Sequence, residues 1–225
     1  MAYVHAAPLK SGSSAVVYTS DDGRKVVRKG GSRSWRNNNP GNIRYTQFAR
    51  DQGAIGTAGG FAVFPDVESG RDALASLLRG TTYFPLTISA AISRYAPPNE
   101  NDTLNYERLI ARLTGLDVTR KLSDLTSAEF SQVVRAIETI EGYVAGTEST
   151  IRRIVAAITD GSRLIRFLIE GDSNYISLAA AIRMVDAGVI DAVAVRPASG
   201  GAYLRSRADG TDANNFGSIA ERENA

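Results

Sequence analysis

The stretch Thr126–Gly142 reads TSAEFSQVVRAIETIEG, and it decides the fold of the middle of this chain. Thr126 and Glu129 have the spacing of a capping box, in which each side chain accepts a hydrogen bond from the other residue's backbone N–H. Apolar residues then recur at helical spacing, and Gly142 is of the type that follows a last helical turn. The stretch therefore predicts a helix that ends at Glu141.

A carboxylate falls on the apolar face of this predicted helix. At about 100° per residue, with Phe130 at zero, Ile137 falls at about −20° and Glu141 at about +20°. Glu138 falls at about +80°, on the edge of that face. Burial disfavours the charged form of a carboxyl group, and a general acid for glycosidic cleavage needs a carboxyl that keeps its proton. Glu141 is thus a candidate acid. The alternative is a helix-end residue that reaches water and pairs with a neighbouring arginine.

The composition excludes several kinds of catalytic site. The 225 residues contain no cysteine and one histidine, His5. A cysteine nucleophile and a thiolate metal site are therefore excluded. A multi-histidine zinc site would need more histidines, and a Ser-His-Asp triad would have to use His5, which lies in a polar leader. The acid–base chemistry that remains belongs mainly to carboxylates. We expect neither a metal nor an organic cofactor.

Charge is spread unevenly along the chain. The net charge is +2, but residues 1–50 hold nine Lys or Arg and two Asp, which gives that region +7. A basic segment of this kind can bind an anionic surface, or it can be a solvated arm. No apolar run of 18 or more residues is present, so no transmembrane helix is predicted. The N-terminus also lacks the basic-then-apolar pattern of a signal peptide.

Composition and turn signals divide the chain into four parts. Residues 1–34 are expected to form a basic flexible leader or a small hairpin with Asp22-Gly23 as its turn. Residues 35–146 are expected to form the main domain. Residues 147–195 are expected to form a helical extension with helices at roughly 149–170 and 174–190, and residues 196–225 a disordered tail.

Within residues 35–146, short strands are expected at 43–45 and 60–64, followed by helices. Helix starts are predicted at the capping residues Asp66 or Ser69, Thr87 and Asp102. The helix stops are Gly80, the Pro97-Pro98 pair, and Gly115.

Two loops carry candidate polar groups. Asn37, Asn38, Asn39 and Asn42 offer carboxamides, which suit sugar recognition because each can donate and accept hydrogen bonds. The alternative is that Asn39-Pro40-Gly41-Asn42 is simply a type II turn. The segment Ala96–Thr103 is typical of a helix stop and restart, and Glu100 within it is a candidate second carboxylate.

These segments together resemble a family of phage-borne and prophage-borne muralytic proteins. That family shares a run seen here as Arg36–Arg44 (RNNNPGNIR), followed by an aromatic strand, here Phe61–Phe64, and an acidic turn with glycine, here Glu68–Arg71. An aromatic-Ala-Pro-Pro-x-Glu-Asn-Asp-Thr segment follows, here Tyr95–Thr103, and then a tyrosine, here Tyr106.

The last family element is a helix that ends in a glutamate, and its counterpart is Ala136–Gly142. The resemblance covers about half of the chain. The sequence departs from the pattern at two points: Tyr95 replaces the usual tryptophan, and Glu141 is followed by Gly-Tyr in place of Asn-Gly.

The resemblance implies a lysozyme-like fold. In lytic transglycosylases and cell-wall glucosaminidases a helix ends in the catalytic glutamate, and a β-lobe with an Asn-Asn turn follows it, whereas here that lobe comes first. A circular permutation would relate the two orders. We therefore expect an α+β domain, mainly helical, of lysozyme-like type with a small β-hairpin lobe; this is an analogy between folds.

The activity implied is cleavage of peptidoglycan glycan strands, with Glu141 as general acid and base. Asn38, Asn39, Asn42, Tyr45 and Tyr95 are then expected to bind the sugars. One glutamate with no evident partner favours a lytic transglycosylase over a muramidase or glucosaminidase. The alternatives are a non-enzymatic component of a virion or secretion machine that only binds cell wall, and an endopeptidase acting on stem peptides.

The same resemblance implies how the protein reaches its substrate. It is expected to be made in the bacterial cytoplasm without a signal peptide and to act in the periplasm or cell wall, where a phage particle, a holin or a secretion device delivers it. Its expected partners are glycan strands and a phage-particle or secretion-apparatus protein. No nucleic acid partner is expected.

Overall fold

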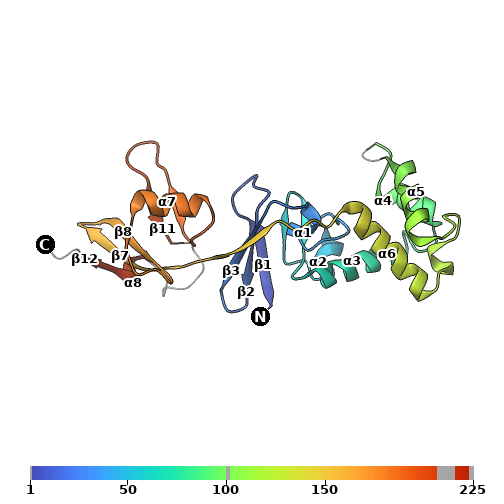
Figure 1. The fold of residues 1–225 in the computed structure, drawn as a ribbon, viewed down its shortest axis with the longest axis horizontal. Coiled ribbons are helices and arrows are strands. Elements are labelled where there is room, and N and C mark those ends of the chain that lie inside the picture. Colours follow the sequence, from blue (N-terminus) through green and yellow to red (C-terminus); the bar gives the residue numbers. More distant parts are fainter. Residues whose placement is uncertain (1, 100–101, 207–215, 223–225) are drawn as a thin grey trace. The chain divides into compact units, whose positions relative to one another are not determined.

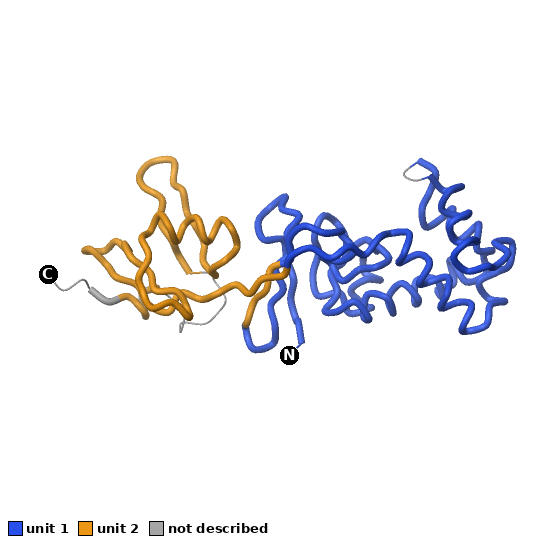
Figure 2. The backbone as a smooth tube through the Cα atoms, in the orientation of Figure 1, with its two compact units in different colours: residues 1–23, 28–147 blue, residues 24–27, 148–225 orange. Residues whose placement is uncertain are grey.

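The computed structural model describes residues 2–99, 102–206 and 216–222. The chain forms two compact units (Figure 2), of which unit 1 comprises residues 1–23 and 28–147 and unit 2 comprises residues 24–27 and 148–225. The divisions fall in strand β3 (Lys25–Lys29) and at strand β6 (Thr147–Ile151). Figure 1 labels the elements of both units.

Unit 1 begins with β-strands. Of the two expectations for residues 1–34, a flexible leader or a small hairpin, the strands agree with the second. β1 (Tyr3–Pro8) pairs antiparallel with β2 (Val16–Ser20) and parallel with β4 (Gly56–Ala58), and β4 forms a hairpin with β5 (Phe61–Val63). Both strands of the expected hairpin are found, as β2 and β3, with Gly23 at φ +81° between them. The approach of β1 and β4 requires Gly56, because a Cβ there would lie 1.8 Å from the carbonyl oxygen of Ala6.

The four helices predicted for unit 1 begin and end at the expected residues, whereas α1 and α2 were not predicted. Asp66, Thr87 and Asp102 each cap a helix through the side chain, and Thr126 and Glu129 form the expected capping box. The bounds are α1 (Arg33–Arg36), α2 (Gln47–Asp51), α3 (Val67–Arg79), α4 (Ile88–Tyr95), α5 (Thr103–Thr114), the 3₁₀ turn η1 (Leu122–Asp124) and α6 (Ser127–Glu141).

One apolar core joins these helices to the hairpin. Phe64, Leu74, Ile92, Ile110 and Ile137 are at most 1 % exposed and come from β5's end, α3, α4, α5 and α6 in turn. The expected pairing of residues 43–45 with 60–64 is also present, as a bridge between Arg44 and Phe61. The core therefore holds the last turn of α6 against the segment that follows α1.

The expectation of a mainly helical, lysozyme-like fold is wrong. The structure is α+β with about 34% helix and 27% strand, in several sheets that include a mixed sheet of six strands. The difference has two sources: residues 3–8 and 16–20 form strands, and residues 147–195 form five strands and one helix where two helices were expected.

Unit 2 is a small sheet packed against a helix. The strand order is β12-β7-β8-β9, and β10 pairs with β11 in a separate hairpin. Phe167, Ile169, Ala181 and Ala192 are fully buried in its core. The bounds are β7 (Ile154–Asp160), β8 (Arg163–Ile169), β9 (Ile176–Ser177), α7 (Leu178–Asp186), β10 (Val193–Val195), β11 (Tyr203–Arg205), α8 (Phe216–Ile219) and β12 (Ala220–Arg222).

The helix expected at 149–170 is therefore a β-hairpin, and the one expected at 174–190 is reduced to α7. Ile154 and Ala157 are buried three residues apart, as they would be on a helix. The cause is a bulge between Ile154 and Ala156, which shifts the alternation of the strand by one residue. Of the tail expected to be disordered, residues 207–215 and 223–225 lie outside the described residues, and the remainder includes β11, α8 and β12.

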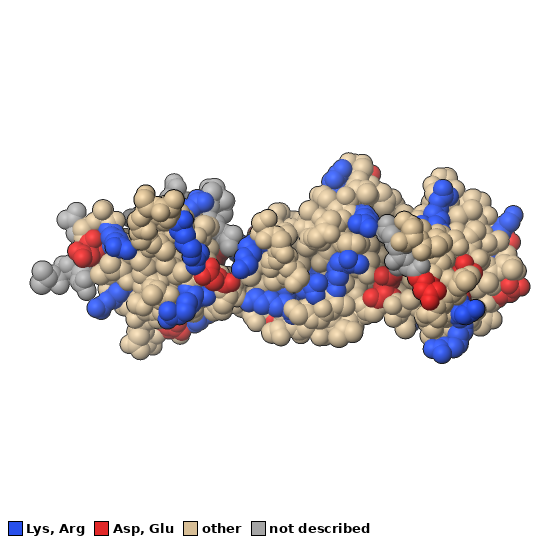
Figure 3. All heavy atoms as spheres, turned by 90° about the horizontal axis from the view of Figure 1, so that it is seen from above, with Lys and Arg blue, Asp and Glu red and all other residues tan. Residues whose placement is uncertain are grey.

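The charge distribution follows the unevenness of the sequence. Figure 3 shows basic side chains in a row in the middle of the picture, where Figure 1 places β1 to β3 and α1. Across the described ranges, no helix is both long and apolar enough to cross a membrane.

Candidate active site

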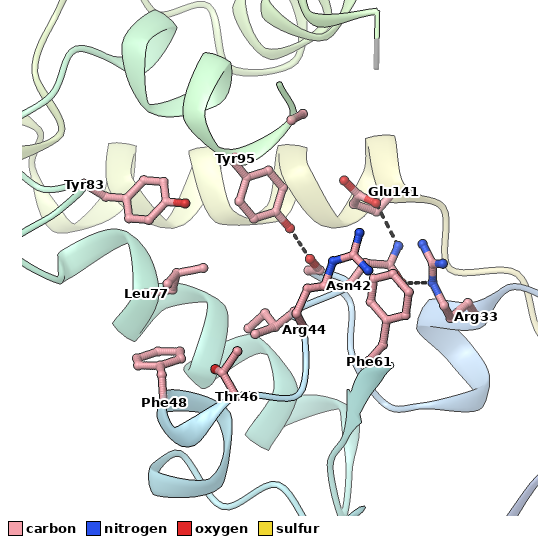
Figure 4. A pocket seen from close by; sticks show the side chains of 13 residues that line it. Arg33, Asn42, Arg44, Thr46, Phe48, Phe61, Leu77, Tyr83, Tyr95 and Glu141 are labelled. Atoms are coloured by element: carbon pink, nitrogen blue, oxygen red, sulfur yellow. Dashed lines mark hydrogen bonds between the residues drawn. The ribbon is translucent and has the colours of Figure 1, made fainter. Parts of the chain in front are cut away.

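A pocket of about 490 Å³ opens in unit 1 beside the end of α6 (Figure 4). Its volume is in the range of small-molecule sites. Its wall combines aromatic and aliphatic side chains with a few polar and charged ones. The lining residues are Arg33, Gly41, Asn42, Ile43, Arg44, Thr46, Phe48, Phe61, Leu77, Tyr83, Tyr95, Ala96 and Glu141.

Glu141 is the acidic residue of this wall among the residues that the structure describes. It is the last residue of α6 and is partly buried, at the rim of the apolar face on which helical spacing predicted it. Its Oε2 accepts a hydrogen bond of 2.7 Å from Nδ2 of Asn42, and its Oε1 accepts one of 3.0 Å from the hydroxyl of Tyr106. Both oxygens are thus held in place, and the carboxyl group faces the pocket (Figure 4).

Asn42 connects Glu141 to a guanidinium group. Its Oδ1 accepts a 3.0 Å hydrogen bond from Nε of Arg33, while its Nδ2 donates to Glu141. The backbone of Asn42 has φ +46°, in the left-handed region that asparagine tolerates better than most residues. That conformation follows a turn at Pro40-Gly41, in which the N–H of Asn42 donates to the carbonyl oxygen of Asn39 at 2.9 Å; a turn was predicted here, but Gly41 lacks the positive φ of the expected type II turn. Asn42 is the one residue of the asparagine cluster in the pocket wall.

Two tyrosines from α4 and α5 lie next to Glu141, of which Tyr95 is in the pocket wall and Tyr106 is outside it. Tyr106 is 7% exposed, and its ring meets that of Tyr95 edge-on at 6.4 Å between centroids. The hydroxyl of Tyr95 donates to the carbonyl oxygen of Gly41. Burial, and then the negative charge of Glu141 among other neighbours, raises the pKa of both phenols far above their usual value. Both therefore remain hydrogen-bond donors at any pH at which the protein would work.

The chain segments on either side of the site are bonded to each other. The backbone N–H of Ser32 donates to the carbonyl oxygen of Val144 at 2.9 Å, and the N–H of Val144 donates to Oγ of Ser32 at 3.0 Å. Oγ of Ser34 donates to the carbonyl oxygen of Gly142. These bonds tie the residue before Arg33 and the residue after it to the chain that follows Glu141.

Asn38 and Asn39, predicted to bind sugar, do not line the pocket. They are 2% and 0% exposed. Nδ2 of Asn38 donates to the carbonyl oxygens of Phe64 and Pro65, and Nδ2 of Asn39 donates to those of Ile43 and Ala62. These side chains satisfy the backbone of the turn and of β5, which is a structural role.

Of the other predicted site residues, some line the pocket and some do not. Tyr95 is in the pocket wall, whereas Tyr45 is outside it and packs against the core with Arg50 over its ring at 5.2 Å. Glu138 is engaged by Arg71, whose Nε and Nη2 each donate to it at 2.9 Å. Glu100, the candidate second carboxylate, lies outside the described residues.

Sequence reasoning left Arg33, Arg44 and Phe61 out of the site. Arg33 was assigned to the leader, and nothing in its local sequence indicates that it meets Asn42. Arg44 and Phe61 were read only as strand residues. Tyr106 was noticed in the family pattern but given no role, although it carries a hydroxyl on the buried face of α5 next to Ile110.

The wall offers no evident metal site. Within the described ranges, no three or more His, Asp or Glu side chains are grouped so that they could hold a metal ion. The chemistry available to the pocket from these residues is proton transfer by Glu141, hydrogen bonding, and contact with aromatic rings.

Comparison with known proteins adds one match. Residues 136–219 match the family model described as "Protein of unknown function (DUF3892)". The match covers the end of α6, with Glu141, and most of unit 2, which is less than half of the chain. No curated protein matches the sequence.

Proposed function

We propose that the protein cleaves the glycan strands of peptidoglycan, with Glu141 as general acid and then general base. The observation that carries the proposal is the position of Glu141 in the pocket wall, with Asn42 and Tyr106 each donating to one of its oxygens. The resemblance of residues 36–142 to phage-borne muralytic proteins supports the choice of substrate.

The reaction begins with a protonated Glu141. It donates its proton to the glycosidic oxygen as the bond between that oxygen and the anomeric carbon breaks, and the sugar on the other side develops positive charge. The resulting carboxylate is stabilised by the hydrogen bonds from Asn42 and Tyr106, and by the charge of Arg33 behind Asn42.

The second step returns a proton to Glu141. The carboxylate removes it either from the sugar's own 6-hydroxyl, whose oxygen then closes an anhydro ring, or from a water molecule that attacks the anomeric carbon. The first route is that of a lytic transglycosylase and the second that of a hydrolase. Because the wall holds one carboxylate among the described residues, we favour the first.

The aromatic side chains suit the neighbouring sugars. Phe48, Tyr83 and Tyr95 contribute rings to the wall, and saccharide rings pack their C–H faces on such surfaces. Thr46 adds a hydroxyl at the same wall. A pocket of mixed aromatic and polar character is what an uncharged sugar ring requires.

The test compares Glu141→Gln with Glu138→Gln, an identical change one turn earlier on the same helix. We expect purified cell wall to release soluble fragments with the wild type, about 10²–10⁴-fold more slowly with Glu141→Gln, and at near the wild-type rate with Glu138→Gln. Full activity of Glu141→Gln would refute the assignment. Mass spectrometry of the fragments separates anhydro-sugars from reducing ends and from cut stem peptides. Wall binding without release would support the non-enzymatic alternative.

A further inference from the structure

Two arginines stand at the rim of the pocket on one aromatic ring. The guanidinium carbon of Arg33 lies 3.5 Å from the centroid of the Phe61 ring, and that of Arg44 lies 4.9 Å from it. Figure 4 shows the two groups to either side of that ring, next to Asn42 and facing the same opening as Glu141. Both residues are exposed, so a bound molecule can reach them.

This arrangement concentrates positive charge where the reaction takes place. The charged residues of the described wall are Arg33, Arg44 and Glu141, a net charge of +1 when Glu141 is ionised and +2 when it carries the proton that it must donate. The pKa of Arg33 is lowered by burial and by the charges of Arg44 and Arg36, although the charge of Glu141 raises it. The surroundings of Arg33 therefore disfavour its charged form.

We infer that the pocket binds a free carboxylate of the substrate between Arg33 and Arg44, next to the bond that is cleaved. This inference rests on the proposed function and specifies its substrate class. Guanidinium groups present planar donor forks that match a carboxylate. Only Asn42 separates Arg33 from Glu141, so the carboxylate must belong to a group attached close to the glycosidic bond.

Glycan strands carry such a carboxylate from two sources. The lactyl group of muramic acid has a free carboxylate when the stem peptide has been removed and an uncharged amide when the peptide is attached. The stem peptide has carboxylates of its own, farther from the sugar ring. The short distance from Arg33 to Glu141 through Asn42 favours the lactyl group, and hence strands from which the peptides have been removed.

The experiment uses four substrates in two matched pairs. The first pair is peptide-free strands with free lactyl carboxylates and the same strands with these converted to methyl amides. The second pair is peptide-bearing strands with free stem carboxylates and the same strands with these amidated. The enzymes are the wild type, Arg44→Gln, and Arg79→Gln, which removes an arginine that lies over Phe130 at 4.2 Å outside the pocket.

At low substrate concentration we expect the wild type to cleave peptide-free strands with free lactyl carboxylates about tenfold or more faster than the corresponding methyl amides. A rate difference of this size corresponds to one charge-assisted hydrogen bond. Arg44→Gln should lose this preference, mainly through a higher KM, and Arg79→Gln should keep it. A preference found only in the second pair supports a carboxylate site with the stem peptide as its source. Equal rates within both pairs for the wild type overturn the inference but leave the proposed function intact, and this result does not depend on whether Arg44→Gln folds. No release from any substrate overturns both.

Discussion

The hydroxyl of Tyr106 is the part of the site whose removal tests the geometry most directly. Tyr106→Phe deletes the 3.0 Å hydrogen bond to Oε1 of Glu141 and keeps the ring, which is 7% exposed and packs edge-on against Tyr95. The substitution leaves the bond from Asn42 to the other oxygen in place. The substitution therefore removes one of the two hydrogen bonds that hold the carboxyl group of Glu141, while the ring still fills its place in the core.

The size of the effect follows from that bond. A hydrogen bond to a charged group contributes about 1.5–3 kcal/mol, and about 1.4 kcal/mol corresponds to a factor of ten in rate. If the bond acts fully on the carboxylate formed as the glycosidic bond breaks, kcat/KM falls by about 10- to 100-fold. The melting temperature should change little, because the ring contacts remain.

The assay measures the initial rate of soluble fragment release at several substrate concentrations, with thermal melting recorded beside it. Tyr143→Phe is the control, since it removes a hydroxyl two residues beyond Glu141 that contacts Asn38 at 3.5 Å and Arg28, and not Glu141. A Tyr106→Phe protein with the kcat/KM of the wild type would show that the bond does not act in the reaction. A loss as large as that of Glu141→Gln would show that positioning is not its only role.

Three further predictions concern stability. Gly70→Ala should lower the melting temperature strongly, because the added Cβ would lie 1.9 Å from the carbonyl oxygen of Asn38, whereas Gly80→Ala, whose nearest contact would be 3.1 Å, should be tolerated. Asn38→Gly permits the backbone φ of +49° but leaves the buried carbonyl group of Phe64 and the partly buried one of Pro65 without the hydrogen bonds from Asn38. Each lost bond costs about 1–3 kcal/mol. Chemical denaturation should therefore detect a loss of stability, while the folded protein keeps its affinity for glycan. Glu129→Gln should destabilise the protein at neutral pH. The hydrogen bond from Arg120, together with those from the helix cap, lowers the pKa of Glu129 to about 2 in the folded state. The ionised carboxylate therefore stabilises the protein above about pH 4.5, and this stabilisation is lost as the pH falls toward 2. The difference between wild type and variant in urea melts should shrink over that range, and a constant difference would contradict the assignment.

Local signals predicted the helices of unit 1 well. Thr126 and Glu129 defined the start of α6, and Gly142 follows its end as expected. Such signals depend on bonds within one turn of the chain, so they can be read without knowing the tertiary structure. The helix predicted at residues 149–170 from apolar spacing is not formed, because Asp160-Gly161 makes a hairpin turn there, with Gly161 at φ +58°. The apolar residues of this stretch recur at helical spacing, and in β7 a bulge brings Ile154 and Ala157 to the same buried side of the strand.

Glu141, Asn42 and Tyr95 were predicted and line the pocket, but only the position of Glu141 followed from a single element. The phase of α6 identified Glu141 because the apolar face of a helix is a property of its own sequence. The contact of Asn42 with Glu141 joins residues 99 positions apart, and that of Arg33 with Asn42 depends on the turn at Pro40-Gly41. Asn38 and Asn39 looked like sugar ligands because carboxamides serve sugar hydroxyls and buried carbonyl groups equally well.

The hydrogen bonds that join residues 32–34 to residues 142–144 have a consequence for engineering. The polypeptide enters and leaves the site-bearing stretch at the same point, with the backbone N–H of Ser32 bonded to Val144. A stretch with adjoining ends can be grafted into a surface loop of an unrelated host, because the host has only a short gap to bridge. Because β1 pairs with β4, such a graft also has to carry β1 and β2 if the junction is to keep Arg33 beside Asn42 and Glu141.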